Sequence, residues 1–172
     1  AATPDQPGGD TWGGLPRSAR RHASASMVGS YDPELDLVYW GTGPPAPLPE
    51  TLRGAGKADL LFTNSTLALD PDTGEMAWYF QHLPRDNWDL DHVFERMIVE
   101  TNVSPNPEVV PWINPNVQPG EMRKIITGIP GKTGLVWTLD AETGEFLWAR
   151  PTVYQNIMTG LDLETGRPSI DE

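Results

Sequence analysis

The sequence predicts an all-β fold assembled from a repeated strand–turn–strand unit, and three observations support this prediction. Short runs rich in β-branched and aromatic residues recur along the 172-residue chain. The composition combines 7 Trp with 17 Gly and 18 Pro, which is typical of short strands joined by tight turns, with large aromatic side chains filling the layers between sheets. One turn sequence is also repeated almost residue for residue. With 38% hydrophobic and 21% charged residues, the chain has the composition of a folded protein, and it is long enough for one domain with its own core.

Several segments have the residue pattern of strands. The clearest is 35–40, which follows a turn at residues 32–34. The best candidate for a helix, residues 91–99, is short and has a mixed pattern. Two Pro/Gly-rich loops, 41–59 and 103–122, are longer than usual connections, and long loops on an all-β scaffold often carry binding and catalytic residues. The predicted strands are residues 35–40, 60–62, 65–69, 77–80, 124–128, 135–139 and 146–148.

The repeated turn is the strongest structural signal. Residues 69–78 read Leu-Asp-Pro-Asp-Thr-Gly-Glu-Met-Ala-Trp, and residues 139–148 repeat the pattern at an offset of 70 residues as Leu-Asp-Ala-Glu-Thr-Gly-Glu-Phe-Leu-Trp. A shorter third copy, Leu-Asp-Leu-Glu-Thr-Gly, occupies residues 161–166. In such a turn the acidic residue and the Thr satisfy backbone groups, the Gly takes the left-handed conformation, and the Trp returns onto the sheet. Repetition of this unit predicts a β-propeller or another repeat array, and a general repeat scaffold without catalysis is the alternative.

Charge and composition exclude some functions. The net charge of -12 argues against nucleic-acid binding, because phosphate backbones are bound mainly through clustered Lys and Arg, and the one basic cluster (Arg17, Arg20 and Arg21) is short. An acidic surface can steer a basic partner or only keep the protein in solution. No apolar run approaches the ~20 residues of a membrane-spanning helix. The absence of Cys rules out disulfides and thiolate metal sites within the chain.

Both ends of the chain read as internal sequence. Residues 1–14 are polar and rich in Gly and Pro, without the apolar core of a signal peptide, and residues 171–172 follow a turn without a closing element. We therefore expect the chain to be a segment of a longer protein.

Four sequence segments together give a specific signal of a protein family, although each segment would be a weak signal alone. They are residues 9–12 (Gly-Asp-Thr-Trp), residues 29–35 (Gly-Ser-Tyr-Asp-Pro-Glu-Leu) running into 39–43 (Tyr-Trp-Gly-Thr-Gly), residues 85–91 (Arg-Asp-Asn-Trp-Asp-Leu-Asp) and the repeated turns. Through these segments nearly the whole chain resembles the pyrroloquinoline-quinone (PQQ) dependent alcohol dehydrogenases of the methanol/ethanol dehydrogenase family. The resemblance implies an all-β, eight-bladed β-propeller whose adjacent blades are held together by Trp-docking turns. Because the family's chains are several times longer, residues 1–172 would form a partial propeller of two to three blades with no separate second domain.

The resemblance also implies an activity. In this family a small alcohol is oxidised to the aldehyde by hydride transfer to PQQ in the central funnel, beside a Ca²⁺ or lanthanide ion that acts as a Lewis acid. A carboxylate takes the hydroxyl proton, and the reduced quinone passes electrons to a cytochrome c in the periplasm. The expected partners are therefore the alcohol, a cytochrome c and the missing propeller blades.

Two acidic residues match functional positions of the family. Asp89, in Trp88-Asp89, matches the catalytic base, and a cation beside it would keep it ionised; the alternative is an ordinary turn residue in a polar loop. Asp91 follows two residues later, so in an extended segment both carboxylates would face the same way and could share one metal ion. In the family an acid at this position accompanies lanthanide-using members, and the alternative is a solvated turn acid.

Lys132, in Gly131-Lys132-Thr133-Gly134, matches the position where relatives carry an Arg or Lys beside the quinone oxygens of PQQ. A cation there would stabilise negative charge that develops on the reduced quinone. The alternative is a hairpin Lys that points into water.

Two positions depart from the family pattern. Where relatives carry a metal-binding Asn after Gly43, this chain has Pro44, which has no side-chain oxygen. Five residues before Tyr31, where relatives carry a Trp on which PQQ stacks, it has Ser26 and so lacks that flat contact area. The family's Glu ligand would lie upstream of residue 1. Three histidines, His22, His82 and His92, have no metal-like spacing and are interpreted as structural.

Three hypotheses follow. The chain is part of an active quinoprotein alcohol dehydrogenase, as residues 88–91 favour, or a divergent or incomplete propeller that serves as a noncatalytic scaffold or interaction module, as Pro44 and Ser26 favour. A repeat module that binds partners through an acidic face would explain the turns but not the segment around Asp89. In every case we expect the isolated chain to be a poor catalyst, because two to three blades expose edge strands that a closed propeller hides.

Overall fold

The computed structural model describes residues 2–21 and 24–170, and its regular elements are mostly strands. The short helices are η1 (Gly9–Trp12), η2 (Arg17–Ala19) and α1 (Glu50–Arg53). None of the helices in these described ranges has the length and apolar character to cross a membrane. The strands are β1 (Ser30–Asp32), β2 (Leu37–Gly41), β3 (Ser65–Leu69), β4 (Met76–Gln81), β5 (Met97–Val103), β6 (Trp112–Ile113), β7 (Glu121–Gly128), β8 (Leu135–Asp140), β9 (Phe146–Pro151), β10 (Met158–Leu161) and β11 (Pro168–Ile170).

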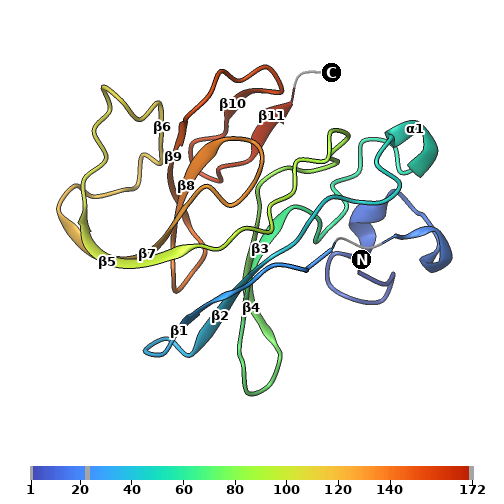
Figure 1. Cartoon of the computed structure of the whole chain (residues 1–172), viewed down its shortest axis with the longest axis horizontal. Helices are drawn as coiled ribbons and strands as arrows, with labels where there is room; N and C mark the ends of the chain where they lie inside the picture. The colour runs from blue at the N-terminus through green and yellow to red at the C-terminus, as the bar shows by residue number, and fades with distance from the viewer. Residues whose placement is uncertain (1, 22–23, 171–172) are drawn as a thin grey trace.

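The strands form two larger sheets and a hairpin. The first sheet has the order β1-β2-β3-β4, the second has the order β5-β7-β8-β9-β6, and β10 pairs with β11. All of these pairs are antiparallel. Figure 1 shows the first sheet in blue and green, the second in yellow and orange, and the hairpin in red. This arrangement confirms the all-β prediction and corresponds to two successive blades followed by one further hairpin.

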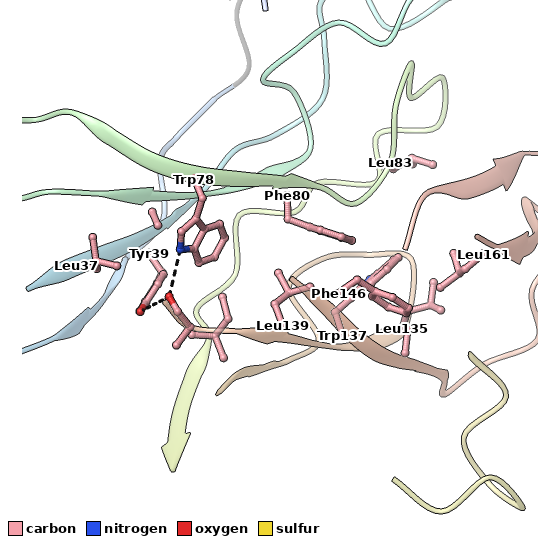
Figure 2. Packing of buried hydrophobic residues seen from close by; sticks show 14 of the residues in the cluster. Leu37, Tyr39, Trp78, Phe80, Leu83, Leu135, Trp137, Leu139, Phe146 and Leu161 are labelled. Atoms are coloured by element: carbon pink, nitrogen blue, oxygen red, sulfur yellow. Dashed lines mark hydrogen bonds between the residues drawn. The ribbon is translucent and has the colours of Figure 1, made fainter. Parts of the chain in front are cut away.

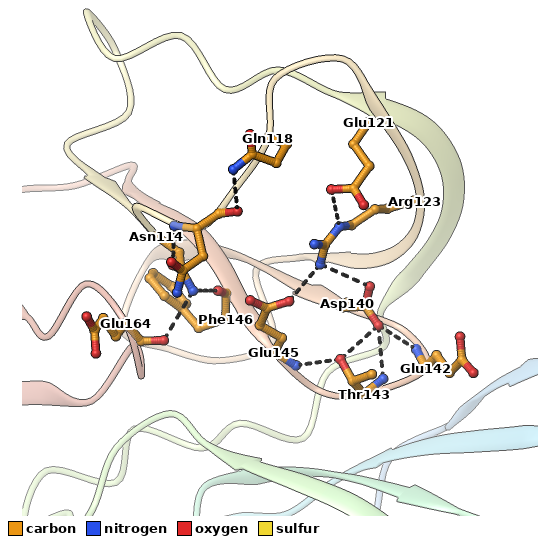
Figure 3. A network of polar contacts seen from close by, with 11 residues as sticks. Asn114, Gln118, Glu121, Arg123, Asp140, Glu142, Thr143, Glu145, Phe146 and Glu164 are labelled. Carbon is orange, nitrogen blue, oxygen red and sulfur yellow. Dashed lines mark hydrogen bonds and ion pairs between the residues drawn. The ribbon is translucent and has the colours of Figure 1, made fainter.

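The three predicted turns have one common hydrogen-bond pattern. The side chains of Asp70, Asp140 and Asp162 each accept a hydrogen bond of 2.8 to 2.9 Å from the backbone N–H of the Thr three residues later. The Gly that follows that Thr has φ between 71° and 75° and donates its N–H to the Asp carbonyl at 2.8 to 3.0 Å. Figure 3 shows the second turn, in which Thr143 Oγ1 also accepts the backbone N–H of Glu145. Because these bonds join neighbours along the chain, the turn forms from local sequence alone.

Trp78 links the two sheets, as expected of a docking turn. An ideal Cβ at Gly144 would lie 2.5 Å from Trp78 Cε3, so the indole ring packs directly on the glycine of the second turn. The indole Nε1 donates to the carbonyl of Ala141 at 3.2 Å, and the Tyr39 hydroxyl donates to the same oxygen at 2.9 Å (Figure 2). The sheet that carries Trp78 is therefore joined to the turn of the next sheet by packing and by two hydrogen bonds.

A shared apolar core surrounds this contact. Alternate residues of β8, among them Trp137, point into it, as expected for a strand with one buried face. The Phe80 ring of the first sheet lies 5.3 Å from the Trp137 ring of the second, in an edge-to-face arrangement (Figure 2). Each large apolar side chain buried in this way contributes about 1.5–3 kcal/mol. At the edge of the core, Lys124 on β7 forms an ion pair of 3.0 Å with the buried Asp32 on β1.

Some expected elements are wrong. Residues 60–62 are not a strand, because Leu60 has a φ of 63°, which a strand cannot accommodate. The helix expected at 91–99 is absent from these described residues, and β5 begins at residue 97. Strand β6 lies inside the expected loop 103–122 and pairs with the edge of β9.

Candidate active site

The sheet topology brings the predicted site residues to one end of the two sheets. Strand β3 begins beside the ends of β2 and β4, and β7 ends beside the starts of β5 and β8. Segment 82–96 therefore crosses from the first sheet to the second at the end where loop 129–134 joins β7 to β8. The repeated turns at Asp70 and Asp140 lie at the opposite end of their sheets. This topology places Asp89 and Asp91 near Lys132.

Lys132 contacts both predicted carboxylates. Its Nζ lies 2.5 Å from Asp91 Oδ2 and 3.3 Å from Asp89 Oδ2, and it also donates to the backbone carbonyl of Asp89 at 3.0 Å. The Asp91 side chain is 21% exposed, compared with 55% for Asp89 and 43% for Lys132. The structure thus brings together three residues that are up to 43 positions apart in the sequence.

The charges in this group stabilise one another. The hydrogen bond to Asp91, followed by that to Asp89, raises the pKa of Lys132 above its ordinary value. Lys132 is therefore an ammonium at neutral pH, and two carboxylates with one ammonium leave one net negative charge. A group of this kind can accept a proton at Asp89 and present a positive charge from Lys132.

Asp89 and Asp91 are the residues expected to bind a metal ion. Asp89 has a left-handed backbone with φ 64°, so the segment 89–91 is not extended, and both carboxylates contact the Lys132 ammonium. Within residues 2–21 and 24–170, no group of three or more His, Cys, Asp and Glu side chains could hold a metal ion. Ca²⁺ takes about six to eight oxygen ligands. Asp89 and Asp91 have the right chemistry for a hard cation, but they fit such a site only as part of a larger ligand set.

The segment before Pro44 runs directly beside Asp91. An ideal Cβ at Gly43 would lie 3.0 Å from Asp91 Oδ1 and 2.5 Å from Ser24 Oγ, so only glycine fits there without a shift of its neighbours. Pro44 itself is half-buried, and Ser26 is exposed. The backbone of Gly43 therefore lies close to the Asp91 carboxylate.

A buried carboxylate that the sequence interpretation missed organises the loop around Asp89. The side chain of Asp86 is fully buried and accepts hydrogen bonds from the backbone N–H groups of Trp88 and Leu90, each at 2.7 Å. It also accepts one from Asn64 Nδ2 at 2.9 Å. The sequence signal for this residue was the Asp-Asn pair that opens the segment, which is typical of a turn whose side chain bonds to backbone two residues later.

A second missed residue, Arg53, joins this loop to α1. Its buried guanidinium donates to the backbone carbonyl of Asp86 at 3.0 Å and to Asn87 Oδ1 at 3.3 Å. Asn87 Oδ1 also accepts the N–H of Glu50, the first residue of α1, at 2.9 Å. These contacts hold the backbone of the site loop from the outer side.

Two histidines lie beneath the site as structural residues, in agreement with their interpretation. The rings of His82 and His92 stack in parallel with centroids 5.0 Å apart. His82 Nε2 is 2.7 Å from Thr66 Oγ1, and the buried Arg96 donates to that hydroxyl at 3.0 Å. Burial is the main cause that lowers the pKa of both imidazoles, that of His92 to about 3, so both are neutral. His22 lies outside the described residues.

Comparison with known proteins places this geometry in a family. The model of the PQQ-dependent glucose/ethanol/alcohol dehydrogenase β-propeller domain matches residues 2–160. The dehydrogenase subunit of alcohol dehydrogenase (quinone) from Gluconobacter oxydans (strain 621H) is 40% identical over 139 residues, which cover 81% of this chain and 16% of that protein. The crystal structure of quinohemoprotein alcohol dehydrogenase from Comamonas testosteroni is similar with a TM-score of 0.74 and 28% identity, over 88% of this chain and 20% of that one. A europium-containing methanol dehydrogenase is similar with a TM-score of 0.73 and 26% identity, over 93% of this chain and 26% of that one.

These matches agree with the structure at two levels. The sheets and the Trp78 contact are those of successive propeller blades, and the chain spans a small part of the length of the proteins it matches. The family model covers nearly all of the residues that form the sheets and the site. The chain therefore belongs to the β-propeller family of PQQ-dependent glucose, ethanol and alcohol dehydrogenases.

Proposed function

We propose that this chain forms part of the active site of a PQQ-dependent alcohol dehydrogenase in which Asp89 is the catalytic base. The observation that supports this most strongly is the contact of Lys132 with both Asp89 and Asp91 at one end of the sheets. A base needs a carboxylate that the substrate can reach, and the side chain of Asp89 is 55% exposed. The reaction is the oxidation of a small alcohol to the aldehyde.

Each residue has a distinct task in this proposal. Asp89 accepts the hydroxyl proton of the alcohol through Oδ1 or Oδ2. Lys132 would help to hold PQQ, and the positive charge of its Nζ would stabilise negative charge on the quinone oxygens. PQQ, when bound, supplies the carbon that accepts the hydride of the alcohol. Lys132 would then exchange part of its contact with the carboxylates for contact with the cofactor.

Asp89 and Asp91 would hold the Ca²⁺ or lanthanide ion together with ligands that come from outside the described residues. Two carboxylates suit a hard cation, and Asp91 is fixed in place beside Gly43. A lanthanide is supported by the similarity to a methanol dehydrogenase that contains europium. The electron acceptor would be a cytochrome c in the periplasm, and the partners would include the remaining blades of the propeller.

The substitution Asp89→Asn in the full-length protein tests this proposal. The amide keeps the size of the side chain but cannot take the proton, so kcat for alcohol oxidation is expected to fall by about 10²–10⁴-fold. Turnover is measured by dye reduction with PQQ and Ca²⁺ or La³⁺ present, at matched PQQ occupancy. Unchanged turnover would exclude Asp89 as the base.

In the same experiment, the unsubstituted full-length protein distinguishes this proposal from the alternative of a noncatalytic propeller scaffold. Pro44 favours it because this residue has no side-chain oxygen to bind a metal ion, and Ser26 favours it because a flat aromatic surface is missing. A scaffold would give neither PQQ binding nor alcohol-dependent turnover in the unsubstituted full-length protein. PQQ binding with turnover would exclude the scaffold.

A further inference from the structure

We propose that Asp86 is the positioning residue for Asp89: its buried carboxylate holds the backbone on both sides of Asp89 and so directs the catalytic carboxylate toward Lys132. This inference rests on the proposed function, because it assigns Asp86 a task only if Asp89 reacts. Asp86 does not face the reacting atoms, since its side chain is fully buried beneath the loop.

The hydrogen bonds of Asp86 enclose Asp89 in the sequence. The N–H of Trp88 bonds to Asp86 Oδ1 at 2.7 Å, and the N–H of Leu90 bonds to Asp86 Oδ2 at 2.7 Å. The second bond fixes the peptide between Asp89 and Leu90, and the first fixes the peptide between Asn87 and Trp88. One side chain therefore anchors the backbone shortly before and directly after Asp89.

The backbone of Asp89 shows why such a constraint is needed. Its φ of 64° lies in the left-handed region, which residues other than glycine adopt only uncommonly. A conformation of this kind persists only where its surroundings hold it. Asp86 offers acceptors alone when ionised, and hydrogen bonds to a charged acceptor are roughly twice as strong as neutral ones.

Only a carboxylate can serve all three donors. Asn64 Nδ2 donates a third hydrogen bond, to Asp86 Oδ2 at 2.9 Å. Oδ2 therefore accepts two hydrogen bonds and Oδ1 accepts one. An amide at position 86 would place an NH₂ group where one of these oxygens is, and a donor would then face another donor. Asp86→Asn therefore changes little in volume and removes at least one of the bonds that orient Asp89.

The chain offers a matched control in Asp32. This carboxylate is also buried and also accepts two backbone N–H groups, from Glu34 at 2.9 Å and from Leu35 at 3.2 Å. It is the last residue of β1, at the opposite end of the first sheet. Asp32→Asn thus causes a comparable loss of buried hydrogen bonds, together with loss of the ion pair to Lys124, without touching the site loop.

The experiment compares Asp86→Asn, Asp32→Asn and Asp89→Asn in the full-length holoenzyme. We expect Asp86→Asn to lower kcat by about 10²-fold, the effect of misplacing a reacting group by about 1 Å, with the alcohol KM within about threefold of the original because alcohol binding is not the target. Asp32→Asn is expected to lower the melting temperature by a similar amount and to leave kcat within about twofold.

Deuterium exchange provides a readout that does not depend on turnover. In the cofactor-free protein, Asp86→Asn is expected to raise uptake in a peptide that spans residues 85–91, whereas Asp32→Asn is not. If Asp86→Asn does not yield folded protein, Asp86→Glu keeps the charge and moves the oxygens by one methylene, and its kcat is expected to fall at least about tenfold.

Three results would overturn the role of Asp86. They are wild-type kcat in the folded Asp86 variant, an equal loss of kcat in Asp32→Asn, and unchanged exchange at residues 85–91. Full turnover in Asp89→Asn would instead refute the proposed function, and the exchange experiment would still report whether Asp86 orders the loop.

Discussion

The contact between Trp78 and the second turn leads to a quantitative prediction for two glycines. Gly74 and Gly144 occupy the same position of the repeated turn, with φ of 73° and 75°. Replacing either with Ala incurs the same left-handed backbone cost of roughly 1–2 kcal/mol. Only at Gly144 does the new Cβ meet a neighbour, 2.5 Å from Trp78 Cε3, whereas at Gly74 no described atom outside the adjacent residues lies within 4 Å.

The difference between the two variants isolates the docking contact. Inserting a methyl group into a packed site costs roughly 1–3 kcal/mol, so Gly144→Ala should lower the free energy of unfolding by about that much more than Gly74→Ala. Urea unfolding followed by Trp fluorescence measures both values against the unsubstituted protein. Equal losses would show that Trp78 does not join the two sheets through Gly144.

Two further predictions concern pH and the completeness of the propeller. Burial lowers the pKa of His82 well below 6.5, so below about pH 6.5 the unfolded chain binds a proton at this residue and the folded chain does not. The contribution of the neutral imidazole to the free energy of unfolding is therefore complete above about pH 6.5. It declines as the pH falls below that value, by up to about 1.4 kcal/mol per pH unit. His92 also has a lowered pKa, of about 3, so His82→Gln is expected to reduce this slope without abolishing it in unfolding curves recorded between pH 7 and 4; an identical slope would contradict the account. The chain purified alone with PQQ and Ca²⁺ or La³⁺ is expected to give no alcohol-dependent dye reduction, because its sheets expose edges that further blades would cover; robust turnover would disprove this.

Local patterns made much of the fold predictable. The turns at Asp70, Asp140 and Asp162 use hydrogen bonds between near neighbours, so the sequence alone specifies them. Strands β3 and β8 follow from runs of β-branched and apolar residues. The segment 60–62 is also apolar, but its first residue, Leu60, has a left-handed backbone, which the apolar pattern does not reveal.

The sequence pointed only to those candidate site residues that belong to a family motif. Asp89, Asp91 and Lys132 were identified through resemblance, and the structure brings them into contact. The local turn pattern at Asp86 does not reveal that the carboxylate is buried against Asn64, 22 residues away. Arg53 was missed because it reaches the carbonyl of Asp86 across 33 residues. Contacts of this kind depend on how loops from different strands meet.

The central claim is that Asp89 removes the proton of the alcohol at the end of the sheets where Lys132 lies. The most direct measurement is the rate of a single turnover in the PQQ-loaded full-length protein, mixed with alcohol in the absence of an electron acceptor. In this experiment the later transfer of electrons has no influence. The account predicts that Asp89→Asn slows PQQ reduction by about 10²-fold or more, while PQQ remains bound. Reduction at the unsubstituted rate would contradict it.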